Sequence, residues 1–162
     1  MNTEADIKRS SLKILRELAL SYNRKRYPHT PEYARSCKPY SDKTANGLTT
    51  CILDFLKFSG WQGERISNTG RYLDNSKVVT DTLGNKRRIG SGKWIRGSGV
   101  KGTADISATI RGKSVKIEVK MKDRQSPDQK NYQAAIEKAG GLYWLVRSFD
   151  DFMNFYKTLC NE

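Results

Sequence analysis

The chain has 162 residues, a length typical of one domain with at most a small appendage. Its 30 Lys and Arg outnumber its 17 Asp and Glu, and the formal charge of +13 favours a polyanionic partner, most often nucleic acid. One histidine and three widely spaced cysteines argue against a zinc site and a disulfide scaffold, and no apolar run is long enough for a membrane span or a signal peptide.

Residues 1–41 are expected to form a helix and an arm outside the main domain. Apolar residues at roughly helical spacing predict a helix over 5–26, which ends in a basic run. Three prolines between 27 and 41 argue against a regular element there, so we expect a Tyr- and Arg-rich arm. Its tyrosines could stack on unpaired bases, or they could pack the arm onto the domain or a dimer partner.

The main domain is expected to cover 42–162 and to begin with a helix over 42–58, which ends at Ser59 and Gly60. A short strand over 61–67 follows. Residues 70–102 are rich in Gly, Ser and Asn and contain eight basic and two acidic residues, a formal charge of +6. Alternating stretches in this segment predict a basic hairpin, inserted over about 70–101, with its turn at 83–86.

The remaining elements predict a sheet covered by helices. Two alternating strands over 103–112 and 113–121 meet at a turn around Gly112. A helix over 127–138 follows, and after it a buried strand over 142–148 and an amphipathic helix over 149–160. This order predicts an α/β sandwich around a mixed sheet.

Two carboxylates on the paired strands carry the main chemical prediction. Asp105 and Glu118 lie six or seven residues on either side of Gly112, so strand pairing would place them opposite each other, and Lys120 shares the face of Glu118. Facing carboxylates repel unless a cation joins them, and Mg²⁺ needs only one or two protein carboxylates besides substrate phosphate. Such an ion activates water for phosphodiester hydrolysis, and Lys120 could orient that water or stabilise developing charge. An ordinary solvated sheet face would show the same alternation.

The following helix begins with a second polar cluster. Ser126, Pro127 and Gln129 have the pattern of a capping box. Gln129, Tyr132 and Gln133 also share one helix face, which could point toward the carboxylates. Capping is the favoured role of Gln129 on local grounds, although one side chain can serve both.

In combination, these motifs resemble a known nuclease family. The motifs KGTAD, IEVK, SPDQ with Tyr132, and AGG, together with the upstream ISNTGR, resemble the VRR-Nuc branch of the PD-(D/E)xK superfamily over about 42–152. The resemblance implies a restriction-endonuclease-like core: a mixed β-sheet flanked by helices, here with an N-terminal helical extension and an inserted basic hairpin. It further implies a homodimeric endonuclease that requires Mg²⁺ or Mn²⁺, uses no small-molecule cofactor, and resolves four-way (Holliday) junctions in DNA.

The resemblance also implies roles for individual residues. Asp105, Glu118 and the carbonyl of Val119 would hold the metal, Lys120 would be the catalytic lysine, and Gln129 would help to hold the site. The family usually has Pro where this chain has Ala104, and it often supplies a further Glu from the first core helix. Here Asn46 is the nearest polar residue, flanked by Asp42 and Asp54. We therefore expect one well-held metal, with Asn46 and Tyr132 as candidate supporting residues.

The basic hairpin and the arm are the expected DNA-contacting parts, mainly through phosphates. The candidate residues are Arg24, Lys25, Arg26, Lys86, Arg87, Arg88, Lys93, Arg96 and Lys101. We expect a cytoplasmic protein of a bacterial or phage-infected cell that meets no membrane. Two other functions stay open: a DNA-binding module that keeps the nuclease fold without activity, suggested by the missing helix Glu, and an RNA nuclease.

Overall fold

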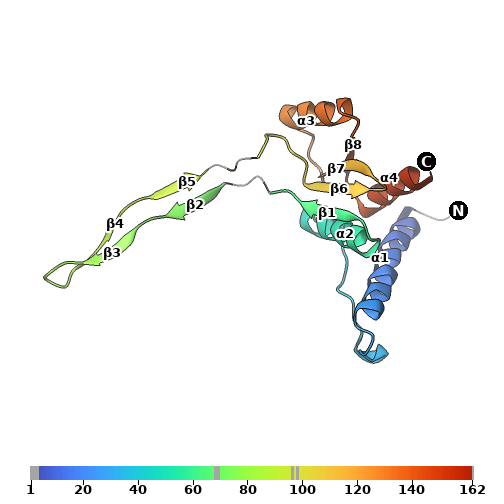
Figure 1. Cartoon of the computed structure of the whole chain (residues 1–162), viewed down its shortest axis with the longest axis horizontal. Helices are drawn as coiled ribbons and strands as arrows, with labels where there is room; N and C mark the ends of the chain where they lie inside the picture. Colours follow the sequence, from blue (N-terminus) through green and yellow to red (C-terminus); the bar gives the residue numbers. More distant parts are fainter. Residues whose placement is uncertain (1–3, 68–69, 96, 98, 162) are drawn as a thin grey trace.

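A four-stranded sheet organises the domain in the computed structural model, which describes residues 4–67, 70–95, 97 and 99–161 (Figure 1). In spatial order its strands are β1 (Gln62–Arg65), β6 (Ile106–Ile110), β7 (Lys113–Val119) and β8 (Leu142–Val146). β1, β6 and β7 pair antiparallel, whereas β7 and β8 are parallel because α3 (Pro127–Lys138) makes the crossover between them. The predicted α/β fold with a mixed sheet is therefore confirmed.

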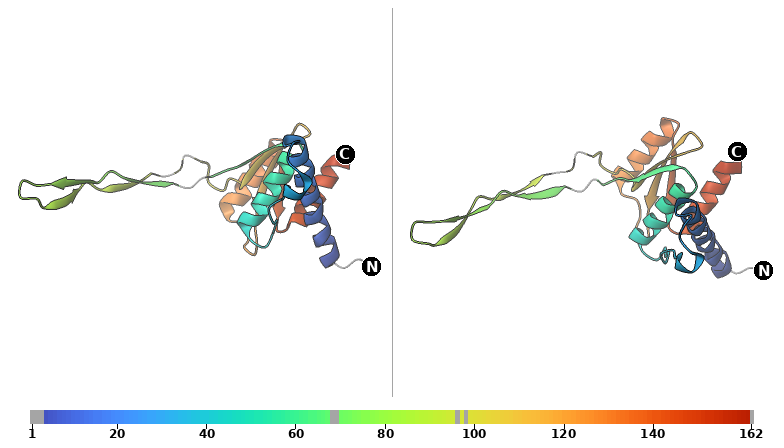
Figure 2. Two further views of the ribbon diagram at one scale, coloured as in Figure 1. Left: turned by 90° about the horizontal axis from the view of Figure 1, so that it is seen from below. Right: turned by 60° about the horizontal axis from the view of Figure 1, so that its bottom comes forward.

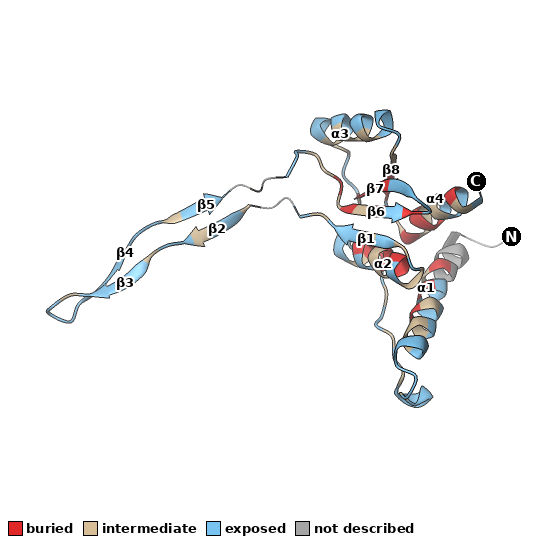
Figure 3. Cartoon of the chain, viewed as in Figure 1, coloured by how far each residue is buried: buried red, intermediate tan, exposed pale blue. Residues whose placement is uncertain are grey.

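The hydrophobic core lies between one face of this sheet and three helices. These are α1 (Glu4–Arg26), α2 (Ala45–Phe58) and α4 (Phe149–Asn161). Alternate residues of β6 and β7 point into the core and are at most 2% exposed: Ile106, Ala108, Ile110, Val115 and Ile117. Leu15 of α1 belongs to the same core, so the N-terminal helix packs directly onto the domain. Figure 3 shows how burial concentrates here.

The opposite face of the sheet is polar and lies beside α3. Among the described residues of α3 none is buried, in contrast to α2 and α4 (Figure 3). Glu118 lies on this face, because it alternates with the core residues Ile117 and Val119. In the part of the chain that the structure describes, no helix has both the length and the apolar character that crossing a bilayer requires.

The arm after α1 packs onto the domain through some of its tyrosines. It contains one short 3-10 helix, η1 (Glu32–Ala34), where no regular element was expected. Tyr40 donates a hydrogen bond to the Asp54 carboxylate at 2.9 Å. The Tyr33 side chain, in contrast, is 93% exposed. Packing therefore accounts for Tyr40, whereas Tyr33 is exposed to solvent.

Residues 70–95 contain most of a long two-stranded ribbon that projects from the domain (Figures 1 and 2). We call this hairpin the β-ribbon. Its strands are β2 (Arg71–Asp74), β3 (Lys77–Thr80), β4 (Lys86–Ile89) and β5 (Gly92–Ile95). β2 pairs with β5 and β3 with β4 in one continuous register, so the predicted inserted hairpin is confirmed.

The turn of the β-ribbon differs slightly from the prediction. It spans 81–85 rather than 83–86, and Lys86 already belongs to β4. The Asp81 carboxylate accepts hydrogen bonds from the backbone N–H groups of Leu83 and Asn85, and Gly84 has a φ of +82°. The side chain of Asp81 therefore starts the turn two residues earlier than the Leu-Gly-Asn-Lys pattern suggested.

The first core helix is also shorter than predicted. α2 begins at Ala45 instead of position 42, because the Thr44 hydroxyl accepts a hydrogen bond from the Gly47 N–H and caps the helix. The Asp42 side chain, which is 5% exposed, is used elsewhere. Its carboxylate accepts a hydrogen bond from the N–H of Phe149, the first residue of α4, at 3.1 Å.

Candidate active site

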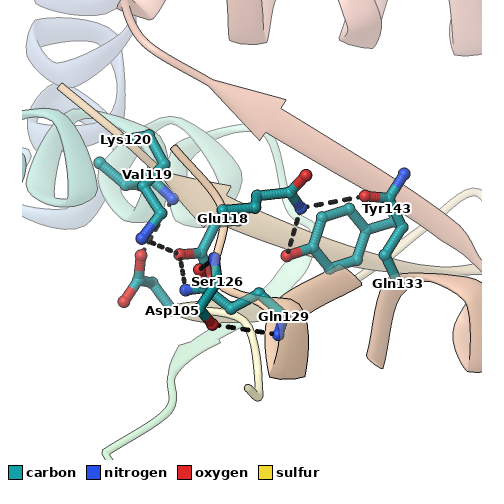
Figure 4. Close-up of polar contacts among 9 residues, drawn as sticks. Asp105, Glu118, Val119, Lys120, Ser126, Gln129, Gln133 and Tyr143 are labelled. Atoms are coloured by element: carbon teal, nitrogen blue, oxygen red, sulfur yellow. Dashed lines mark hydrogen bonds and ion pairs between the residues drawn. The ribbon is translucent and has the colours of Figure 1, made fainter. Parts of the chain in front are cut away.

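Strand pairing brings Asp105 and Glu118 to the same end of the sheet (Figure 4). β6 and β7 are joined by a two-residue turn, Arg111 and Gly112, with φ values of +51° and +79°. This turn sets the register in which Ile106 faces Ile117, and one further step places Asp105 opposite Glu118. The sequence predicted this juxtaposition.

Backbone groups hold Asp105 in place. Its carbonyl accepts a hydrogen bond from the N–H of Ile66 at 2.8 Å. Its Oδ2 accepts one from the N–H of Val119 at 2.9 Å. The Asp105 carboxylate is therefore fixed against β7 through Oδ2, and Oδ1 is the oxygen that this bond does not use.

Glu118 is a buried carboxylate with one unsatisfied oxygen. Its side chain is 2% exposed, and Oε1 lies 3.2 Å from the Lys120 Nζ. Oε2 is buried and has no hydrogen-bond partner among the described residues. Burial, and then the charge of Asp105, raises the pKa of Glu118. A buried carboxylate oxygen without a partner costs folding free energy, and either protonation of Glu118 or a bound cation would lower that cost.

Gln129 connects α3 to Glu118. Its N–H donates to the Ser126 hydroxyl at 3.3 Å, and its Oε1 accepts from the Ser126 N–H at 2.9 Å, which completes the capping box. Because the cap occupies Oε1, Nε2 remains free to donate to Oε1 of Glu118, and it does so. The same side chain thus serves both of the roles that the sequence suggested.

If the site hydrolyses phosphodiesters as the resemblance implies, replacing Gln129 by Ala should reduce cleavage by about 10-fold or more, because Glu118 loses the donor that orients it. Ser126→Ala is the matched control. It removes the hydroxyl that accepts from the Gln129 N–H but leaves the contact between Gln129 and Glu118, and it should cost about 1 kcal/mol of stability. Cleavage rates and urea unfolding of both variants provide the test. If the two variants lose activity equally, Gln129 acts only as a cap.

Tyr132 contacts Tyr143 of β8, and Gln133 contacts Gln125, which lies close to the Tyr143 hydroxyl. Gln133 Oε1 accepts from Gln125 Nε2 at 3.0 Å, and Gln125 Nε2 lies 3.5 Å from the Tyr143 hydroxyl. The Tyr132 ring meets the Tyr143 ring edge-on, with centroids 6.4 Å apart. Burial, and then the nearby charge of Glu118, raises the pKa of Tyr143 to about 12.

Sequence reasoning missed Tyr143, because it lies in a continuously apolar run that looked like pure core. The available clue was its register. Tyr143 pairs with Lys116, two residues before Glu118, so it lies on the Glu118 face of the sheet. It is a neutral phenol at the wall of the site.

The three polar residues considered as stand-ins for the missing helix Glu have other partners. Asn46 Oδ1 accepts from Arg65 at 3.0 Å. Asp42 binds the start of α4, and Asp54 binds Tyr40 and, at 2.6 Å, the Nζ of Lys38. Over the described ranges, His, Cys, Asp and Glu side chains form no group of three that could hold a metal ion.

The donor set nevertheless fits one hard divalent cation. Asp105 and Glu118 offer carboxylate oxygens, and Oε2 of Glu118 accepts no hydrogen bond from the described part of the chain. Mg²⁺ and Mn²⁺ bind such oxygens and take their remaining ligands from water and substrate phosphate. The Val119 carbonyl, the third ligand implied by the resemblance, belongs to the residue that follows Glu118 in β7.

A cavity of about 490 Å³ opens beside this site. Lys120, Ser126, Asp128 and Gln129 line one part of it, and the loop that returns from the β-ribbon lines the rest: Gly97, Gly99, Val100, Lys101, Gly102 and Thr103, with Gly70. Gly102 has a φ of +76°, and a Cβ there would overlap the Asp128 backbone. The loop therefore approaches the start of α3 more closely than any other residue type would allow.

Some of the candidate DNA-contacting residues are bound to other side chains, whereas others are exposed. Arg24 pairs with Glu32, Arg26 donates to the Tyr22 hydroxyl at 3.0 Å, and Arg88 binds Asp74 and Ser76 within the β-ribbon. Arg87 lies 3.9 Å from Asp81. Lys25, Lys86 and Lys93 are exposed, and Lys101 lines the cavity. Arg96 lies outside the described residues.

The site thus combines a fixed carboxylate pair, a lysine, a positioned amide and a cavity next to a basic projection. These groups offer ligands for one divalent cation and a cation for a phosphate, an arrangement that can support metal-dependent phosphodiester hydrolysis. Comparisons of the chain with models of protein families, with curated proteins and with solved structures find no match.

Proposed function

We propose that this protein is a metal-dependent endonuclease of the PD-(D/E)xK superfamily, in its VRR-Nuc branch, that hydrolyses phosphodiester bonds in branched DNA such as four-way junctions. The observation that carries the proposal is the buried Glu118 carboxylate, with an unsatisfied oxygen, opposite Asp105 and beside Lys120. Asp42 is also a buried carboxylate, but it binds the N–H of Phe149 and has a structural role.

The residues divide the chemistry among themselves. A bound Mg²⁺ or Mn²⁺ would polarise the scissile phosphate and lower the pKa of a coordinated water. Asp105 and Glu118 would hold that ion. Lys120, 18% exposed and 3.2 Å from Glu118 Oε1, can orient the attacking water or stabilise charge on the phosphate. Gln129 keeps Glu118 in position from α3.

The arrangement of elements and the charge support the same proposal. The carboxylates lie at one end of a mixed sheet, and the β-ribbon leaves the domain at that end. The chain carries a formal charge of +13, which suits a polyanionic substrate. A two-fold junction offers two equivalent cuts, so we expect the active form to be a homodimer.

One observation favours a second candidate function, a DNA-binding module without activity. The first core helix lacks the Glu that the family often supplies, and Asn46, the nearest polar residue, is engaged with Arg65. Such a module would bind DNA with strong salt dependence and yield no metal-dependent product.

Metal removal tests the proposal. A labelled four-way junction is incubated with the protein in Mg²⁺, in Mn²⁺ or in EDTA, and the products are separated on a denaturing gel. We expect cleavage in either metal and none in EDTA, because Asp105 and Glu118 alone provide no strong nucleophile. Cleavage that persists in EDTA would contradict a metal-dependent reaction. Binding without a product in either metal would favour the inactive module.

A further inference from the structure

Two aromatic side chains lie exposed on one face of the β-ribbon near its base. Tyr72 of β2 and Trp94 of β5 are directly opposite each other in the register, so they share a face. Their side chains are 61% and 63% exposed. Aromatic residues normally bury most of their large surface, so two such residues left open together indicate a surface that receives a partner.

Each of these side chains lies over a glycine of the opposite strand. A Cβ added to Gly92 would overlap the Tyr72 hydroxyl, and one added to Gly70 would lie 2.7 Å from Trp94 Nε1. Each side chain is thus held against the ribbon backbone while most of its surface remains accessible. Covering a glycine in this way supports a strand, which is a sufficient structural role for the aromatics. It also fixes them as a rigid platform at little cost in side-chain entropy.

The platform adjoins the candidate active site. Gly70, against which Trp94 lies, lines the same cavity as Lys120 and Gln129. Four residues before Gly70, the N–H of Ile66 donates to the carbonyl of Asp105. Trp94 therefore lies against the part of the cavity wall that Gly70 forms.

The charges around the platform suit a nucleic acid backbone. Arg71 and Lys93 precede the two aromatics in their strands and are exposed, so their side chains extend from the other face of this two-stranded ribbon. On the same face as the aromatics, Arg88 is bound to Asp74 and Ser76 and braces the ribbon. Lys101 lines the cavity that Gly70 also lines. Open aromatic surfaces on a basic ribbon suit single-stranded nucleic acid, because cations can follow the backbone while every unpaired base has a face on which to stack.

We propose that Trp94, with Tyr72 beside it, is a stacking platform for unpaired bases next to the scissile phosphate. The inference rests on the proposed nuclease function and makes its substrate class more specific: DNA with unpaired nucleotides beside the cut, as in flaps, forks and opened junctions. Bases within an intact duplex are already stacked and offer no face to the platform.

Binding of two labelled DNAs tests the platform in the Glu118→Gln protein, so that no cutting interferes. One DNA is a fully paired duplex, and the other is the same duplex carrying a short unpaired thymidine flap. Trp94→Leu should weaken binding of the flap DNA by about 10-fold and change duplex binding by less than about 2-fold. Trp94→Phe, which keeps a stacking ring over Gly70, should restore most of the loss.

Each outcome has a distinct meaning. Equal loss on both DNAs would overturn the platform and show that Trp94 only supports the ribbon. No loss on either DNA would overturn it as well. Binding is measured in the Glu118→Gln background, so it does not depend on cleavage. If wild type cuts no DNA but Trp94→Leu selectively weakens flap binding, the nuclease function is refuted and the platform is supported. If wild type cuts DNA but Trp94→Leu causes no selective loss, the platform is refuted and the nuclease function is supported.

Discussion

Replacing Glu118 by Gln is expected to make the metal-free protein more stable and to abolish both its metal response and its cleavage activity. The wild-type carboxylate is 2% exposed and faces Asp105, and its Oε2 has no partner among the residues that the structure describes. Gln has the same shape, carries no charge, and can still accept the hydrogen bond from Gln129. Removing a buried charge that serves function rather than folding commonly gains about 1 kcal/mol of stability.

Urea unfolding in EDTA and in excess Mn²⁺ measures this effect. Wild type should be stabilised by Mn²⁺, because a ligand that binds only the folded state shifts the equilibrium toward it, whereas Glu118→Gln should not respond. Asp42→Ala is the matched control: it removes a buried carboxylate that has a structural partner, leaves the Phe149 N–H unpaired, and should lose about 1–3 kcal/mol. If Glu118→Gln were destabilised as Asp42→Ala is, Glu118 would be a structural residue.

The difference in stability between wild type and Glu118→Gln in EDTA is also expected to depend on pH. The pKa of Glu118 is raised in the folded state, so its protonated form is the one that folding favours. The stability that protonated Glu118 contributes is fully present at pH values below its ordinary pKa of 4.5. It is lost as the pH rises through the raised pKa of the folded state. The advantage of Glu118→Gln in EDTA should therefore be largest near neutral pH and shrink as the pH falls toward 4.5. An advantage independent of pH would show that the buried charge is not its cause.

Replacing Lys120 by Ala is expected to lower the cleavage rate by about 10²–10³-fold while leaving metal-dependent stabilisation in place. Lys120 Nζ lies beside Glu118 Oε1 and lines the cavity, so it can act on the water or the phosphate without being a metal ligand. Single-turnover cleavage and Mn²⁺-dependent unfolding separate the two effects. Lys130→Ala on α3 is the control, since Lys130 is exposed and should behave as wild type. Loss of the Mn²⁺ effect in Lys120→Ala would place its role in building the site instead.

The carboxylate pair could be predicted from the sequence because two local rules determine it. Alternation with period two assigned Glu118 and Lys120 to one face, and the short turn at Arg111 and Gly112 set the register that brings Asp105 opposite Glu118. The capping box of α3 could likewise be predicted from the spacing of Ser126 and Gln129. These features depend on neighbours within one hairpin or one helical turn.

Features that depend on distant contacts were not predictable. The unsatisfied oxygen of Glu118 arises from packing between the sheet and α3, and the position of Tyr143 at the site depends on the parallel pairing of β8. Arg88 was predicted from the sequence to contact DNA, but the pairing of the ribbon strands places it against Asp74. Composition alone could not distinguish a cation that braces the ribbon from one available to a phosphate.

Cleavage of a labelled four-way junction and of a matching linear duplex by wild type and by Glu118→Gln, in Mg²⁺, tests the central claim most directly. Products are separated on a denaturing gel, and binding is followed on a native one. We predict that wild type cuts the junction in preference to the duplex, and that Glu118→Gln binds the junction without cutting it. Equal cleavage by both proteins would contradict an active site built on Asp105 and Glu118.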